Sequence, residues 1–457
     1  MGVIYRMLQN PALVRAIGRW SLAALILNSI IGTGVFILPG TIGGMLGWRS
    51  MIAWALAALV IAAMVFCFAE VASRFTGAGG AYLYAEAAFG RFAGIQIGWL
   101  TYFARCVTAA VQANLFTTYL AEFWPAAGAR AGSFAVTTLF LGLLAVINFR
   151  GVKSGTQVSN FFAVVKVVPL LVFGAMGLAW LVAGHTVAAP VASADTTGGW
   201  LRAMLLLMFA YGGFESGVIP LAEAKDPRRD APFALLTGLA LVTLVYLAAQ
   251  VAVLVTLHDP GASARPLAES ARVILGAGGA VFMVVTAMLS VYGWMASNMV
   301  TVPRLTMAMA DQGDLPRVFA RIHPRTHTPW VSIVVFTVIA WALAIQATLL
   351  QNLSLSAVSR LFPYAAVCAA LIAFRKRDAA PSTDDRVAPA LFRVRAGVPL
   401  AIFGVLASLV LASRMTLREG IAMAVIIVLG AVHWAWVRGA APPTPRFRPR
   451  PRASPPR

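Results

Sequence analysis

Twelve apolar segments, separated by short polar stretches, dominate this sequence of 457 residues. A helix that crosses the hydrocarbon core of a bilayer needs about 20 mostly apolar residues. Runs of roughly this length cover residues 22–45, 51–68, 94–120, 134–149, 158–183, 199–221, 233–257, 273–303, 331–350, 353–374, 398–412 and 421–437. Charged residues make up only 11% of the chain, against about 25% in a typical soluble domain. The sequence therefore predicts an all-α integral membrane protein with twelve transmembrane helices.

The strong positive charge of the chain is explained by the membrane. A formal net charge of +20 would suggest nucleic-acid binding in a soluble protein, but cytoplasmic loops of membrane proteins accumulate Lys and Arg. An even number of spans places both termini on one side, and most basic residues outside the spans lie on that same side. We therefore predict an inner (plasma) membrane protein with both termini cytoplasmic and no nucleic-acid partner.

No soluble domain interrupts the spans. We expect residues 1–20 to form a cytoplasmic N-terminus, 376–397 a cytoplasmic loop, 398–437 the last two helices and 438–457 a disordered basic tail rich in Pro and Arg. The three cysteines lie in apolar segments without the spacing of a metal site. A membrane enzyme would need clustered His, Asp or Glu, and a channel a continuous polar path. The sequence shows neither, so we predict a transporter with no catalytic residue, metal or cofactor.

The first predicted span is weakened at its centre. It reads "LNSIIGTGVFILPG" and carries Gly32, Thr33 and Gly34 in succession. Glycine in a helix interior costs about 1 kcal/mol relative to alanine. Taken alone, the motif is equally consistent with close helix packing, for which membrane helices use small residues, and with a functional break.

The sixth span repeats this peculiarity. In "LLMFAYGGFESGVIPLAEAKDPRRDAP", Gly212 and Gly213 interrupt the helix, Glu215 follows directly and Pro220 comes next. Paired Gly/Pro-interrupted segments in corresponding halves of a sequence point to a transporter with inverted repeats. Because the two broken spans are five apart, we predict two five-helix repeats, residues 21–185 and 198–375, with two additional helices at the end.

The chemistry of a break indicates its ligand. Unwound backbone is tolerated at membrane depth only where it is buried in protein or lines a cavity. Freed amides and the N-terminus of a half-helix favour a carboxylate, whereas freed carbonyls and a half-helix C-terminus favour a cation. A site with both features suits a zwitterion such as an amino acid.

Several motifs, in the right order from residue 22 to about residue 330, resemble those of the amino acid/polyamine/organocation (APC) transporters. They are "IIGTGVFILPG", "EVASRFTGAGGAYLYAEAAFGRFAG", "YGGFESGVIPLAEAKDPRRDAP" and "GWMASNMVTVPRLTMAMADQGDLPRVFARIHPRTHTPW". The resemblance implies an amino acid permease of the five-plus-five inverted-repeat (LeuT-like) fold with broken helices one and six. It also implies secondary transport by alternating access around a site between those helices.

By this resemblance, the substrate α-carboxylate meets backbone amides of the first break, and the α-ammonium meets carbonyls freed at the second. An arginine/agmatine antiporter of the family has a gating Trp where this chain has Phe209, and an aromatic floor where it has Trp294. Ordinary packing of Phe209 and a lipid-facing Trp294 are the alternatives. The implied substrate-binding set is Ile31, Gly32, Thr33, Gly34, Arg105, Phe209, Ala210, Gly212, Gly213 and Trp294.

Three ionisable residues stand out inside the predicted spans, where charge is expensive and functional. Glu215 either stabilises the open backbone or carries a proton. Lys166 corresponds to a lysine that proton-coupled relatives place where sodium-coupled ones hold sodium. Because burial disfavours its charged form, Lys166 either cycles a proton or pins the first span as a permanent cation.

Arg105 departs from the family pattern, since the similar antiporter has a small uncharged residue there. Its guanidinium matches carboxylates in geometry. It binds an acidic substrate side chain, pairs with Glu215, or points elsewhere along its helix. Its charge argues against a cationic substrate, because two positive charges would be brought close together.

The sequence thus predicts proton-coupled uptake of a neutral or acidic amino acid, with the lipid bilayer and protons as its other partners, by a monomer or homodimer. The alternatives are an amino acid exchanger, or a transporter of the same fold for another solute such as a polyamine or nucleobase.

Overall fold

The structure is a computed structural model that describes residues 17–75, 79–150, 155–185, 197–218, 221, 224–311, 313–326, 328–379 and 387–438. The predicted disordered tail beyond residue 438, the first 16 residues and Pro220 lie outside the described residues. The helices are α2 (Arg19–Ile30), α3 (Thr33–Leu46), α4 (Ser50–Ala72), α5 (Ala81–Phe89), α6 (Arg91–Leu120), α7 (Arg130–Phe149), α8 (Gly155–Val182), α9 (Thr197–Tyr211), α10 (Phe214–Gly217), α11 (Pro227–Thr256), α12 (Pro266–Asp311), α13 (Trp330–Gln346), α14 (Leu349–Ala379), α15 (Gly397–Ala412) and α16 (Leu417–Val437).

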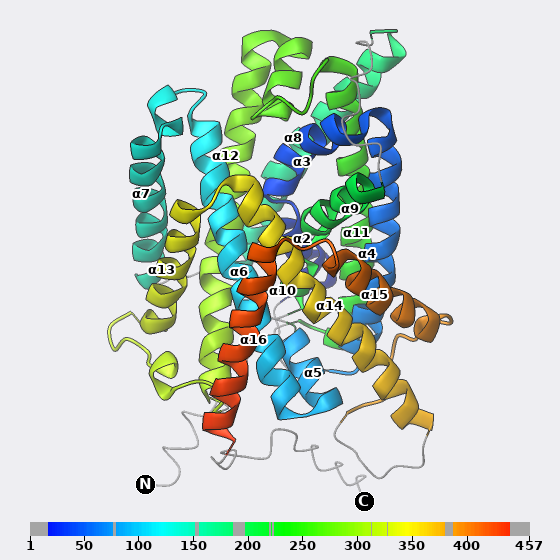
Figure 1. Cartoon of the computed structure of the whole chain (residues 1–457), viewed down its shortest axis with the longest axis vertical. Helices are drawn as coiled ribbons and strands as arrows, with labels where there is room; N and C mark the ends of the chain where they lie inside the picture. Colours follow the sequence, from blue (N-terminus) through cyan, green and yellow to red (C-terminus); the bar gives the residue numbers. More distant parts are fainter. Residues whose placement is uncertain are drawn as a thin grey trace, which may run out of the picture.

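The described chain is an all-helical bundle whose long helices run mainly along its longest axis (Figure 1). Within the described residues, seven helical stretches are long and apolar enough to cross a membrane, and α13 and α15 are shorter apolar helices. The outer faces of the bundle are also apolar: Leu139 on α7, Leu409 on α15 and Val432 on α16 are 72%, 61% and 62% exposed. Apolar surface on this scale suits lipid rather than water, so the prediction of an all-α membrane protein is confirmed.

The two predicted breaks are present in the backbone. Helix α2 ends at Ile30, Ile31 and Gly32 are non-helical, and α3 begins at Thr33. Helix α9 ends at Tyr211, and Gly213 precedes α10 with φ +123°. The broken elements α2, α3, α9 and α10 lie in the interior of the bundle, between α7 and α13 on one side and α4 and α15 on the other (Figure 1).

The described ends of the chain lie at the same end of the bundle. Hydrogen bonds and an ion pair at this end connect the start of α2 to the end of α16. The Lys225 amide donates to the Ile17 carbonyl, Arg228 donates to the Ser73 carbonyl, and Arg74 pairs with Asp378. Arg377 donates to the Ala87 and Ala88 carbonyls, and Arg91 donates to the Val437 carbonyl.

Some boundaries differ from the predicted ones. The ninth predicted span, 331–350, is too long, because α13 ends at Gln346 and α14 begins at Leu349. The turn at Ala347 and Thr348 comes a few residues before the polar pair Gln351 and Asn352, which marks the boundary in the sequence but lies inside α14. Helix α12 starts at Pro266, before the predicted 273, and bends at Gly276. The short helix α5 was not predicted.

Gly213 offers a test of the second break. A Cβ there would lie 2.2 Å from the Ser29 carbonyl oxygen, on a backbone with positive φ. We expect Gly213→Ala to destabilise the fold by about 1–3 kcal/mol, and to lower the melting temperature of the purified protein in detergent. Gly278→Ala, at a helical glycine with open space around its Cβ position, is the control and should leave the melting temperature unchanged or raise it slightly. Equal melting temperatures for both variants would show that the break tolerates a side chain.

Candidate functional site

The carbonyls freed at the first break are all occupied by side chains from other helices. Lys166 on α8 donates its Nζ to the Asn28 and Ile31 carbonyls, at 3.1 and 3.0 Å. Trp294 on α12 donates its Nε1 to the Ser29 carbonyl at 3.0 Å. These donors replace the helical amides that the break removes, as unsatisfied carbonyls at membrane depth require.

Tyr246 on α11 bridges the two breaks. Its hydroxyl lies 2.9 Å from the Ala210 carbonyl oxygen at the end of α9 and 3.3 Å from the Ile30 carbonyl oxygen at the end of α2. The backbones also touch: a Cβ on Gly34 would lie 2.8 Å from the Ala210 Cα. The C-terminal end of α9 and the start of α3, the second half of the first broken span, are therefore in direct contact.

The N-terminus of α3 has no side-chain cap. Its N-cap is Gly32, which offers no side-chain cap to the first amides of the helix. Thr33 lies in the first turn, is fully buried, and donates its hydroxyl to Gln112 Oε1 on α6 at 2.8 Å. A Cβ on Gly32 would meet Gln112 Nε2 at 2.4 Å. Uncapped amides at a buried helix N-terminus favour an anionic group.

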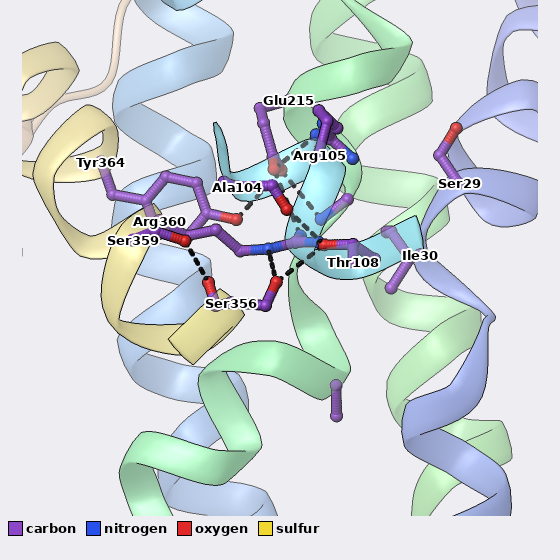
Figure 2. A network of polar contacts seen from close by, with 12 residues as sticks. Ser29, Ile30, Ala104, Arg105, Thr108, Glu215, Ser356, Ser359, Arg360 and Tyr364 are labelled. Atoms are coloured by element: carbon purple, nitrogen blue, oxygen red, sulfur yellow. Dashed lines mark hydrogen bonds and ion pairs between the residues drawn. The ribbon is translucent and has the colours of Figure 1, made fainter. Parts of the chain in front are cut away.

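A charged network occupies the second break (Figure 2). Glu215 Oε1 accepts from Arg105 Nη2 on α6 at 2.5 Å and from Arg360 Nη1 on α14 at 3.2 Å. Its Oε2 accepts from the Tyr364 hydroxyl at 2.9 Å and from the Gly213 amide at 2.8 Å. The carboxylate is 5% exposed and the two arginines are 1% and 2% exposed. Three side-chain donors from two helices, α6 and α14, and one amide of the break itself thus hold one buried carboxylate.

Arg360 is fixed by further contacts. Its Nη2 donates to Thr108 Oγ1 at 2.7 Å, and its Cζ lies 5.6 Å from the centre of the Phe209 ring. A Cβ on Gly212 would come within 2.3 Å of Arg360 Nη1. Glycine at this position therefore lets the guanidinium lie directly against the unwound backbone.

The structure brings the predicted site residues together around the two breaks, and those whose burial it gives are all buried. Of the three interpretations of Arg105, it shows the pairing with Glu215. Trp294 is 1% exposed, so it faces the interior and not lipid. The roles predicted for these residues in substrate binding and proton coupling stay predictions.

Sequence reasoning missed three contributors to the site: Arg360, Tyr364 and Tyr246. Arg360 was detectable, because it is a fourth ionisable residue inside a predicted span, 353–374, and such residues are functional candidates. The tyrosines carry no such signal, since buried tyrosines are common in helix bundles.

Two discontinuous helices meeting in the interior of a multi-pass bundle, with charged groups at the meeting point, define a membrane transporter rather than an enzyme. Residues 17–438 match the amino acid permease family. The chain belongs to that family, within the APC superfamily, and is an amino acid transporter.

Curated relatives vary in their named substrates. The chain is 27% identical to the methylthioribose transporter of Bacillus subtilis (strain 168) over 413 residues, which cover 86% of this chain and 88% of that protein. It is 28% identical to the serine/threonine exchanger SteT of the same organism, over 71% of this chain and 75% of the exchanger. It is 30% identical to the large neutral amino acids transporter small subunit 2 of Oryctolagus cuniculus, over 70% of this chain and 62% of that protein.

Because Glu215 is buried among two arginines and Glu122 is not, replacing Glu215 should lower the stability of the fold more than replacing Glu122. Glu215→Ala leaves two buried arginines facing each other without a counter-charge, and we expect it to cost about 3–5 kcal/mol of stability. Glu122→Ala removes a carboxylate that pairs with Arg265 and with the half-exposed Arg272, and should cost about 0–1 kcal/mol. Thermal melting of both variants in detergent measures the difference. Similar small losses for both would mean that the buried network does not stabilise the fold.

Proposed function

We propose that this protein is a secondary active amino acid transporter that works by alternating access, with twelve spans arranged as two inverted repeats of five and two further helices. One observation carries the proposal: each proposed repeat places a basic side chain from its fifth span on the break of its own first span. Lys166 on α8 binds the carbonyls of the first break. Arg360 on α14 lies against Gly212 at the second.

The third span of each repeat also contacts a break, and in both repeats it is the first one. In the first repeat this span is α6, whose Gln112 binds Thr33 beside the first break. In the second repeat it is α12, whose Trp294 also reaches the first break, at Ser29. Equivalent spans that converge on one point support a repeat architecture built around a central site.

The substrate head group would bind between the breaks. The uncapped amides around Thr33 and Gly34, with Ile31 and Gly32 before them, suit the α-carboxylate. The α-ammonium would take the carbonyls at the end of α9, near Phe209, Ala210, Gly212 and Gly213. The Ala210 carbonyl is held by Tyr246, and Gly34 is in contact with Ala210. Binding therefore requires the two broken spans to separate, which is the motion that alternating access supplies.

Two aromatic side chains frame this position. Phe209 lies under the Arg360 guanidinium and would close over the substrate as a gate. Trp294 is anchored by its bond to the Ser29 carbonyl and would form the floor. Both roles are consistent with the burial of these rings in the closed arrangement.

Lys166 is the proposed coupling residue. Its ammonium is fully buried and binds two carbonyls of the first break. Loss of its proton leaves a neutral amine, whose N–H groups bind the two carbonyls more weakly than those of an ammonium, so protonation would stabilise one arrangement of α2 and α3 over the other. Glu215, by contrast, accepts four hydrogen bonds, and we assign it the structural role of holding the second break.

The remaining features follow from the transporter class and charge distribution. We propose an inner-membrane protein with cytoplasmic termini. Both ends of the described chain lie at one end of the bundle, and this end is rich in arginine, as cytoplasmic faces of membrane proteins are. The repeats would span residues 21–185 and 198–375, in a monomer or homodimer.

Two alternatives have specific support. Exchange of amino acids is favoured by the likeness to a serine/threonine exchanger. Transport of a solute other than an amino acid is favoured by the likeness to a methylthioribose transporter across most of both chains. The uncapped α3 N-terminus, which suits a carboxylate, speaks for an amino acid.

Uptake into proteoliposomes tests the function and its coupling. We expect the purified protein to take up a labelled amino acid from a panel, several-fold faster when the outside is more acidic than the inside. In Lys166→Ala the pH gradient should lose its effect, because the titrating group is gone. Lys225→Ala, which removes an exposed lysine, should behave as the wild type.

The outcomes separate the alternatives. If the pH gradient does not change the rate of uptake but amino acid inside the vesicles increases it, the protein is an exchanger and not a proton-coupled transporter. Transport of methylthioribose, a polyamine or a nucleobase without uptake of any amino acid would contradict the proposal itself.

Recognition of the head group is tested with analogues. An accepted amino acid should compete for uptake at least about tenfold better than its decarboxylated amine, because the amine lacks the group that the α3 amides would bind. Equal competition by the amine would remove the α-carboxylate from the proposed binding mode.

A further inference from the structure

The charges at the second break do not balance. Arg105 and Arg360 both contact Glu215, and in the described part of the chain Glu215 is the one carboxylate in ion-pair contact with either of them. Tyr364, the other side chain on the carboxylate, is a neutral donor. With both arginines protonated and Glu215 ionised, the cluster has a formal charge of +1 at a site that is almost fully buried.

One arginine also has unused hydrogen-bonding capacity. Arg105 uses Nη2 for Glu215, while its Nη1 is buried and has no hydrogen-bond partner among the described residues. Arg360, in contrast, has a partner for each of its nitrogens: Ser356 for Nε, Glu215 for Nη1 and Thr108 for Nη2. A buried guanidinium N–H without a partner costs free energy, so the arrangement is complete only when another acceptor arrives.

The excess charge lies beside the proposed head-group position. Arg360 contacts the Phe209 ring and the backbone at Gly212, and Gly213 in turn lies against the Ser29 carbonyl of the first break. Figure 2 shows Arg105, Glu215 and Arg360 together, with Ser29 and Ile30 of the first break beside them. A substrate held between the breaks would thus have the two arginines within reach of its side chain.

We propose that Arg105 and Arg360 form the specificity site of the transporter, and that they receive the side-chain carboxylate of an acidic amino acid. This rests on the proposed amino acid transport. An acidic amino acid has a net charge of −1, which cancels the +1 of the cluster. A neutral amino acid leaves that charge in place, and a cationic one adds to it. In low dielectric these differences decide between substrates.

The test compares acids with their isosteric amides. Wild-type protein in proteoliposomes is given labelled aspartate, asparagine, glutamate and glutamine, each over a range of concentrations. We expect at least one acid to have a KM roughly 10- to 100-fold lower than its amide, as for one hydrogen bond to a charged group. This comparison uses only the unaltered chain, so it does not depend on whether a variant folds.

Variants then assign the preference to residues. Arg105→Gln should raise the KM for the acid about 10- to 100-fold more than the KM for its amide, because it removes a charged donor. Arg105→Lys keeps the charge and should recover part of the preference. Arg360→Gln should lower the preference in the same sense. Arg229→Gln, at an arginine whose side chain is 78% exposed, should leave both KM values unchanged.

Three results would overturn the inference. If neutral amino acids are taken up and neither acid has a lower KM than its amide, this inference is refuted while the proposed amino acid transport stands. Neutral uptake that depends on external chloride, tested by replacement with gluconate, would place an inorganic anion at the arginines instead. Failure to transport any amino acid would overturn the proposed function and this inference together.

Discussion

The structure depends on one constraint: a backbone that leaves the helical pattern inside a membrane must find new hydrogen-bond partners, because lipid supplies none. At the first break these partners are Lys166, Trp294 and Tyr246, which come from α8, α12 and α11. The break is therefore the point at which distant helices are joined. Any movement that opens it must change these contacts together, which makes the break a natural place to couple ligand binding to a global motion.

The second break solves the same problem with charge. The Glu215 carboxylate accepts a hydrogen bond from the Gly213 amide and three more from two arginines and a tyrosine. Buried ion pairs are weak sources of stability but costly to break. Such a network therefore serves specificity of arrangement more than stability. It also leaves a net positive charge at the centre of the bundle, which a substrate of zero net charge does not offset.

Much of this was predictable, and the reasons for the failures are physical. The breaks at Gly32 and Gly213 were found because glycine pairs are conspicuous in apolar runs. The joint between α13 and α14 was misplaced by a few residues, because the polar pair Gln351 and Asn352, which interrupts the apolar run, lies inside α14 and not at the turn. Arg360 was overlooked although a charge inside a span was visible in the sequence. Tyr246 gave no signal, since its position depends on which face of α11 meets the breaks.

The sequence by itself determined the membrane class, the helical fold, the positions of both breaks and the family to which the chain belongs. These follow from local composition and spacing, which hydropathy and glycine content record directly. Only the tertiary structure decided that Arg105 pairs with Glu215, that Arg360 joins them, and that Lys166 binds the first break. Those contacts join residues more than 100 positions apart, and the packing of whole helices, which no local pattern encodes, determines which side chains meet.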